Sequence, residues 1–323
     1  MITKHIALIC DDNYCFPTIV CIQSIINHAS SNYEYVIHVC TFGLTKENKE
    51  SLQRMGKNNV EVVINQFDMS DYREKLKKIS QKTHVSPTAL IKFELPVFFS
   101  ELDTLLYLDS DIILKGSIDE LFDVNLHDNY LAAAYEFHQR LNKINYSFKR
   151  DYQDFYFNSG VMLLNLNKMR QDDVTPKLWY FKENCTKTQL MDQETLNSVC
   201  MPKVVPLSII WNFNPFFYKE RYLKEINGVY HEDFNDLNAL ENKVCIIHYV
   251  GKSDKPWLYE DAKLRVFWDD SLKAYNPGAK LDLKKYPRDR QNKINSIRAK
   301  IRMFGTKGIM CYAVNRLLNR TLL

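Results

Sequence analysis

The stretch from Thr104 to Leu114 constrains the fold more than any other part of this sequence. Five largely apolar residues, Thr104 to Leu108, predict a strand that is buried on both faces. Two carboxylates, Asp109 and Asp111, follow this strand directly, and a further apolar triplet comes after them. Burying an uncompensated carboxylate is costly, and positions i and i+2 of an extended chain point to the same side. The pattern therefore favours a cation shared by the two carboxylates, with a helix cap or a pair of surface turn residues as the alternative.

Upstream of this strand, the chain alternates strands with helices. We expect strands at 5–10, 35–42 and 60–64, with helices at 17–28 and 45–55 between them. This order predicts an α/β fold with a mostly parallel central sheet and helices on its faces. Pro96 should kink or shorten the helix that contains it. The other expected elements are helices at 71–80, 86–99, 167–182 and 191–199 and strands at 131–135, 156–164, 204–205 and 244–249.

Polar side chains follow the first and the fourth of the expected strands. Asp11 and Asn13 come after the strand at 5–10, and the Asp109–Asp111 turn comes after the strand at 104–108. Open parallel sheets bind ligands beyond the carboxyl ends of their strands, so we expect both turns to open into one crevice. The sequence contains neither GxGxxG nor GxxxxGK[ST]. A metal ion would therefore have to neutralise the phosphates of a bound nucleotide, which again favours the carboxylate pair.

The composition is that of an ordinary globular protein. Of the 323 residues, 46% are hydrophobic and 25% are charged. The eight cysteines form no CxxC pair and lie mostly in apolar runs, which is typical of buried thiols in a reducing compartment. No apolar run approaches the roughly 18 residues that a membrane span needs, and the first residues lack the pattern of a signal peptide. We therefore expect a cytoplasmic protein.

Positive charge is concentrated in residues 284–323. This segment has eleven Lys and Arg and a single acid, a net charge of +10, although the whole chain carries only +4. Apolar residues are interleaved with the basic ones, so 292–304 and 308–322 are expected to form basic amphipathic helices. We divide the chain into a domain at 1–260 and a C-terminal extension at 261–323. Such helices favour an anionic membrane surface, with packing against the domain or contacts between copies in an oligomer as the alternatives. Nucleic acid is disfavoured because the rest of the chain is acidic and has no recognition motif.

Several spaced motifs together resemble glycosyltransferase family 8, over about residues 5–257. The segment Leu-Tyr-Leu-Asp-Ser-Asp-Ile at 106–112 is similar to the family's metal-binding motif, and Cys-Asp-Asp-Asn-Tyr at 10–14 to its uridine-binding turn. Residues 156–166 resemble its donor-sugar strand, and Met-Asp-Gln-Glu at 191–194 resembles the segment nearest the anomeric carbon. The family includes bacterial lipooligosaccharide galactosyl- and glucosyltransferases and glycogenin. The resemblance implies one GT-A-type nucleotide-sugar-binding domain.

The resemblance also implies roles for individual residues. A metal ion, Mn²⁺ or less suitably Mg²⁺, would be held by Asp109, Asp111 and His248. Gln193 and Asp192 would be the catalytic residues beside the reacting carbon. The implied nucleotide-binding residues are Asp11, Asn13, Lys92, Ser110, Gly251 and Lys255. The implied donor-sugar residues are Glu136, Asn158, Ser159 and Asp192, and the implied acceptor residue is His84.

The sequence departs from the family pattern at three places. Lys92 stands where the family usually has an arginine, so the charge is kept but the bidentate fork is lost. Glu136 stands where an aspartate contacts the sugar in the galactosyl enzymes. The loop between His248 and Lys255 is one residue longer than in those enzymes. The second departure leaves the choice of sugar open.

The implied reaction is a metal-dependent, retaining transfer of glucose or galactose from a UDP-sugar. The implied acceptor is a cell-surface glycan or glycolipid, such as lipopolysaccharide or capsule, reached at the inner face of the membrane. Retention requires a covalent glycosyl-enzyme or front-face attack by the acceptor, and Gln193 is a poor nucleophile, so front-face attack is favoured. Two other functions stay open: a self-glycosylating priming protein like glycogenin, and a catalytically idle nucleotide-sugar-binding scaffold.

Overall fold

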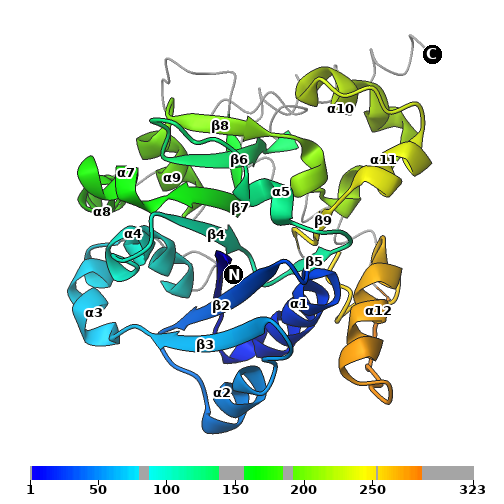
Figure 1. Cartoon of the computed structure of the whole chain (residues 1–323), viewed down its shortest axis with the longest axis horizontal. Helices are drawn as coiled ribbons and strands as arrows, with labels where there is room; N and C mark the ends of the chain where they lie inside the picture. The colour runs from blue at the N-terminus through cyan, green and yellow to red at the C-terminus, as the bar shows by residue number, and fades with distance from the viewer. Residues whose placement is uncertain (1, 80–86, 138–155, 185–191, 252–253, 286–323) are drawn as a thin grey trace, which may run out of the picture.

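A seven-stranded sheet with the order β3-β2-β1-β4-β7-β6-β8 forms the centre of the protein (Figure 1). The computed structural model describes residues 2–79, 87–137, 156–184, 192–251 and 254–285. The strands are β1 (Ile2–Ile9), β2 (Tyr33–Thr41), β3 (Val60–Gln66), β4 (Thr104–Leu108), β6 (Leu131–Tyr135), β7 (Phe157–Asn165) and β8 (Val204–Leu207). Strands β1 to β4 run parallel, β7 is antiparallel to β4 and β6, and β6 and β8 are parallel. The predicted α/β fold with a mostly parallel sheet is confirmed.

Both faces of the sheet are buried, because alternate residues of each strand enter different apolar layers. Leu8 and Leu106 pack in the layer that includes α1 (Cys15–His28). Ala7 and Leu105 pack in the opposite layer. The second layer also receives side chains of η2 (Pro87–Glu94), α4 (Leu95–Phe98), α7 (Leu166–Gln171), α8 (Val174–Asn184) and α9 (Gln193–Cys200). Burial on both faces explains why the central strands are continuous apolar runs in the sequence.

A second, two-stranded sheet begins where β4 ends. Strand β5 (Ile112–Leu114) pairs antiparallel with β9 (Ile246–His248), with Ile112 opposite His248. The expected strand at 244–249 is therefore shorter than predicted and lies outside the main sheet. A separate apolar cluster that includes Phe213 packs around β5 and β9. This pairing carries His248 to the carboxylates that precede β5.

Two helix predictions were wrong in their extent. The expected helix at 86–99 is the 3₁₀ helix η2 followed by the single turn of α4, with Pro96 in the first turn of α4, where its missing N–H costs nothing. The expected helix at 167–182 is split into α7 and α8. Asp173 lies between them with a φ of 50°, a left-handed conformation that ends the first helix.

The helices α2 (Lys46–Gln53), α3 (Met69–Lys78) and α9 lie where the sequence predicts them. The sequence did not predict α5 (Asp119–Phe122), α10 (Leu223–Tyr230), α11 (Leu237–Lys243) or α12 (Arg265–Tyr275). Trp268 and Leu272 of α12 are buried in the cluster that contains Val20 of α1. This part of the expected extension thus packs on the domain, and the boundary at residue 260 stays a prediction. The expected basic helices at 292–304 and 308–322 lie outside the described residues.

Two observations concern the cysteines and the helices of the part of the chain that the structure describes. Its six cysteines are free, and five of them are buried. None of its helices is long and apolar enough to cross a membrane.

Candidate active site

The carboxyl ends of β1 and β4 meet at an open cleft of about 260 Å³. Asp11 and Tyr14 enter it from the turn after β1, Asp109 and Asp111 from the turn after β4, and Lys92 from η2. Strands β1 and β4 are parallel neighbours in the sheet. The two turns therefore share one crevice, as the sequence predicts.

Asp109, Asp111 and His248 form the one cluster of possible metal ligands found among the described residues. One ligand atom of each lies within 4.8 Å of the others. The Nε2 atom of His248 is 3.1 Å from Asp111 Oδ1 and 3.6 Å from Asp109 Oδ2, and the imidazole is 3% exposed. Two carboxylates and one imidazole are a donor set that suits Mn²⁺ and, less well, Mg²⁺. The residues present therefore fit a divalent cation.

Gly160 makes room for this cluster. A Cβ atom on this residue would lie 2.1 Å from His248 Cε1 and 2.9 Å from Asp109 Oδ2. The backbone of β7 is tied to the same place, because the Asp109 N–H donates to the Gly160 carbonyl at 2.8 Å. Only a residue without a side chain allows β7 to pass so close to the three ligands.

Two buried lysines compensate the carboxylates. Lys92 Nζ is 3.1 Å from Asp109 Oδ1 and also donates to Asp192, and Lys255 Nζ donates to Asp111 Oδ2. With both lysines charged and the three carboxylates ionised, the group keeps one net negative charge. A bound divalent cation would reverse the sign of that charge and so favour an anionic ligand in the cleft.

These ion pairs keep the groups charged despite their burial. Burial would raise the pKa of Asp111, but Lys255 and His248 hold it far below its usual range. Burial would also raise the pKa of Asp192, yet the Lys92 ammonium group and the Ser159 hydroxyl keep it lowered. Burial would lower the pKa of Lys92, but Asp109 and Asp192 raise it to about 12. The cleft is thus a site of fixed charges rather than of neutral acids.

The expected catalytic residues come together with part of the expected donor-sugar group. Asp192 and Gln193 stand at the start of α9. The Ser159 N–H donates to Gln193 Oε1 at 3.1 Å, and its hydroxyl donates to Asp192 Oδ2 at 3.0 Å. Lys92 Nζ donates to the Ser159 carbonyl at 3.3 Å as well as to Asp192. These buried contacts fix both side chains next to the metal-ligand cluster.

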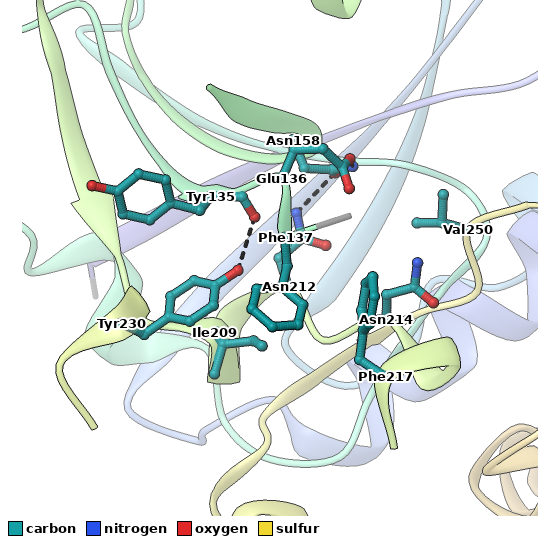
Figure 2. Close-up of a pocket in the computed structure, with 10 residues that line it drawn as sticks. All are labelled: Tyr135, Glu136, Phe137, Asn158, Ile209, Asn212, Asn214, Phe217, Tyr230 and Val250. Carbon is teal, nitrogen blue, oxygen red and sulfur yellow. Dashed lines mark hydrogen bonds between the residues drawn. The ribbon is translucent and has the colours of Figure 1, made fainter. Parts of the chain in front are cut away.

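Asn158 and Glu136 line a small pocket, whose lining residues are drawn in Figure 2. Asn158 Nδ2 donates to Glu136 Oε2 at 2.7 Å, and Asn158 Oδ1 accepts from Asn212 Nδ2 at 2.9 Å. Asn212 Oδ1 is 2.8 Å from His248 Nδ1. Hydrogen bonds therefore connect an expected donor-sugar residue with an expected metal ligand.

Of the remaining predicted residues, Asp11 and Ser110 line the cleft. The Asp11 carboxylate accepts from the backbone N–H groups of Asn13 and Tyr14, and the side chain of Asn13 is exposed. Ser110 Oγ donates to the Ile9 carbonyl at 2.8 Å, which ties the turn after β4 to β1. Gly251 is exposed and has a φ of 90°, which favours glycine. His84 lies outside the described residues.

Three residues of the site were not singled out from the sequence. Tyr107 donates to Asp109 Oδ1 at 2.6 Å, and its position two residues before Asp109 on an extended chain could have predicted this contact. Gly160 interrupts an apolar strand, which is a signal of close backbone approach. Asn212 carries no such signal, because it lies in an irregular segment far from the motifs in sequence.

Comparison with known proteins identifies relatives of the whole domain. The family model described as Glycosyl transferase family 8 matches residues 5–261. The lipopolysaccharide 1,2-glucosyltransferase of Escherichia coli is 28% identical over 260 residues, which are 76% of this chain and 71% of that relative. The family model and this relative thus both match most of the chain.

Solved structures share the fold. The galactosyltransferase LgtC in complex with donor and acceptor sugar analogues has a TM-score of 0.62 and 23% identity, covering 90% of this chain and 100% of that one. The bifunctional glycosyltransferase WbbM has a TM-score of 0.66 and 22% identity, with 84% of this chain matching only 51% of that one. The fold is that of GT-A-type glycosyltransferases. The chain belongs to glycosyl transferase family 8.

Proposed function

We propose that the protein is a metal-dependent, retaining hexosyltransferase that moves glucose or galactose from a UDP-sugar to a cell-surface glycan or glycolipid. The observation that carries this proposal is the cluster of Asp109, Asp111 and His248, whose two carboxylates line the cleft and whose Asp111 bonds to Lys255. The E. coli relative is named as a lipopolysaccharide glucosyltransferase, and LgtC as a galactosyltransferase. These names support either hexose as the group transferred.

The charge of the cleft supports a requirement for metal. Without an ion, the net negative charge of the three carboxylates and two lysines would repel a diphosphate. A divalent cation held by Asp109, Asp111 and His248 would act as a Lewis acid on the leaving diphosphate. Mn²⁺ is the ion that we propose for this donor set, with Mg²⁺ as the weaker fit.

The lysines and the turn after β1 would position the nucleotide. Lys255 Nζ, which bonds to Asp111 and lies 5.9 Å from the Tyr14 ring centroid, would stabilise the developing charge on the diphosphate. Asp11 and Asn13 would hold the uridine, and Ser110 and Gly251 would line the nucleotide path. Lys92, buried between Asp109 and Asp192, would fix the carboxylates on both sides of the donor.

We propose that the acceptor attacks from the front face, with the leaving phosphate taking its proton. Asp192 is engaged by Lys92 and Ser159, which makes its carboxylate a weak nucleophile and a suitable partner for donor hydroxyls. Gln193 is fixed by the Ser159 N–H, and its amide would lie near the reacting carbon. Glu136, Asn158 and Ser159 complete the proposed donor-sugar contacts, and His84 is the proposed acceptor contact.

The basic segment at 284–323 would attach the enzyme to the anionic inner face of the cell membrane. The attraction of each Lys or Arg to such a surface is about 1 kcal/mol, and the interleaved apolar residues would add burial in the headgroup region. This attachment would bring a cytoplasmic enzyme close to a lipid-linked acceptor. It rests on composition alone, because most of the segment lies outside the described residues.

Replacing one carboxylate tests the proposal directly. Asp111→Asn should reduce Mn²⁺-dependent UDP-hexose hydrolysis roughly a thousandfold, because the amide removes the charge that holds the cation. Asp103→Asn is the matched control: Asp103 precedes β4, at the end of the strand opposite Asp109, and is exposed. The control should hydrolyse the donor at close to the wild-type rate. Near wild-type hydrolysis by Asp111→Asn would contradict the metal-site assignment.

Intact mass spectrometry after incubation with the donor alone tests the front-face mechanism. The mass of the protein should stay unchanged, because direct attack by an acceptor needs no covalent glycosyl-enzyme. A single labile hexose adduct would instead establish an enzyme nucleophile. A stable adduct on tyrosine would favour the self-glycosylating alternative.

Gly160→Ala tests whether the room beside His248 matters. The new Cβ must displace His248 or Asp109, so we expect Mn²⁺-dependent hydrolysis to fall about a hundredfold or more. Gly228→Ala in α10 is the control, because a Cβ there meets nothing within 4 Å and alanine favours a helix. Equal activity of both variants would show that the cluster tolerates the displacement.

Removal of residues 286–323 tests the membrane contact. The shortened protein should transfer hexose to a soluble acceptor at the wild-type rate but should no longer sediment with anionic liposomes. The full chain should sediment with anionic liposomes and much less with neutral ones, because the attraction is electrostatic. Unchanged sedimentation of the shortened protein would refute the attachment.

A further inference from the structure

Four side chains that are distant in sequence form one hydrogen-bonded chain from Glu136 through Asn158 and Asn212 to His248. The three links measure 2.7, 2.9 and 2.8 Å. Figure 2 shows Glu136, Asn158 and Asn212 among the residues that line the small pocket, with dashed lines for hydrogen bonds between the residues drawn. His248, at one end of these hydrogen bonds, is a proposed metal ligand, whereas Asn212 lies outside the motifs that indicate the site.

A backbone group determines which atom donates in each hydrogen bond between Glu136 and His248. The Gly160 N–H can only donate, and it donates to Asn158 Oδ1 at 2.9 Å. Asn158 Oδ1 is therefore the acceptor for Asn212, which must turn its Nδ2 toward it. Asn212 Oδ1 then faces His248, so the bond between them requires a proton on His248 Nδ1.

The backbone holds Asn212 and His248 in register. The segment that follows Asn212 lies alongside β9, with Phe213 bridged to Ile247 in parallel. The Phe213 N–H donates to the Ile246 carbonyl at 3.0 Å, and the His248 N–H donates to the Phe213 carbonyl at 2.9 Å. These two bonds leave the Asn212 side chain little freedom to move away from the imidazole.

Apolar packing shields the hydrogen bonds between Glu136 and His248 from competing water. Phe137 is 3% exposed and Phe217 1% exposed, and both line the pocket beside Asn212 (Figure 2). Tyr230 closes another side, where its hydroxyl donates to the Tyr135 carbonyl at 2.9 Å. Asn158 and His248 are themselves buried. A side-chain network in such surroundings is more rigid than one in water.

We propose that Asn212, oriented by Asn158 and the Gly160 N–H, is a positioning residue for the metal ligand His248. Asn212 accepts a hydrogen bond from the His248 Nδ1–H group. This bond keeps the lone pair on Nε2 and directs it at Asp109 and Asp111, where a divalent cation would bind. Partners of this kind on the second ring nitrogen set the tautomer and the orientation of ligating histidines. The inference rests on the proposed metal site and assigns Asn212 a role that the sequence motifs do not indicate.

Mn²⁺ binding tests this role without an activity assay. Free Mn²⁺ in titrations of the full chain is measured by electron paramagnetic resonance for the wild type and three variants. Asn212→Leu removes the acceptor and should weaken Mn²⁺ binding by about 10- to 100-fold. Asn212→Asp keeps an acceptor for the Nδ1 proton and should stay within a few-fold of the wild type. Asn214→Leu is the matched control, because Asn214 lines the same pocket but its side chain accepts from the Phe216 N–H.

A kinetic readout separates positioning from general damage to the fold. In UDP-hexose hydrolysis, Asn212→Leu should raise the Mn²⁺ concentration at half-maximal rate by the same factor, and saturating Mn²⁺ should restore most of kcat. A variant that is merely misfolded would lose kcat at every Mn²⁺ concentration.

The possible results distinguish the two proposals. Wild-type Mn²⁺ affinity in Asn212→Leu would overturn the positioning role alone, as would an equal loss of affinity in Asn212→Asp and Asn212→Leu. A loss of kcat in Asn212→Leu that saturating Mn²⁺ does not restore would also overturn it. Absence of Mn²⁺ binding by the wild type would overturn the metal site itself, and the positioning role with it.

Discussion

The structure depends on the placement of two carboxylates between the buried strands β4 and β5. Such groups are costly to bury unless opposite charges or donors surround them. Asp109 accepts a hydrogen bond from the Tyr107 hydroxyl and forms an ion pair with Lys92, and Asp111 forms an ion pair with Lys255. Tyr107 and Lys92 line the cleft, and Lys255 bonds to Asp111, which also lines it. The groups that compensate the buried carboxylates are therefore the groups that would contact a charged ligand. We infer that the cost of burial is offset by the same contacts that build the site.

The fold brings these partners together through two departures from a simple parallel sheet. Strand β7 runs antiparallel beside β4, so that Gly160 and its neighbours pass directly behind Asp109. Strand β9 leaves the main sheet to pair with β5, so that His248 faces the turn after β4. Both departures bring residues to the carboxyl end of β4, where an open α/β sheet binds its ligands. The proposed metal site, sugar contacts and nucleotide turn therefore converge on one strand end.

Local patterns predicted the strands of the main sheet, the helices α1, α2, α3 and α9, and the crevice, because alternating burial and the order of elements are properties of short segments. The cluster of Asp109 and Asp111 followed from their spacing, and His248 from resemblance to a family. The pairing of β9 with β5 and the burial of Trp268 did not follow, since each depends on contacts between distant segments. The left-handed conformation of Asp173, which divides the expected helix at 167–182, was also missed. Asn212 is the clearest case, because only the folded chain places it beside His248.

The central claim is that Asp109, Asp111 and His248 hold a divalent cation that in turn holds the donor diphosphate. Anomalous diffraction at the manganese edge, from crystals grown with Mn²⁺ and UDP, tests this claim most directly. We expect one anomalous peak between the three side chains, in contact with the diphosphate and beside Lys255. A bound UDP with no anomalous peak there, or a peak away from these residues, would contradict the account.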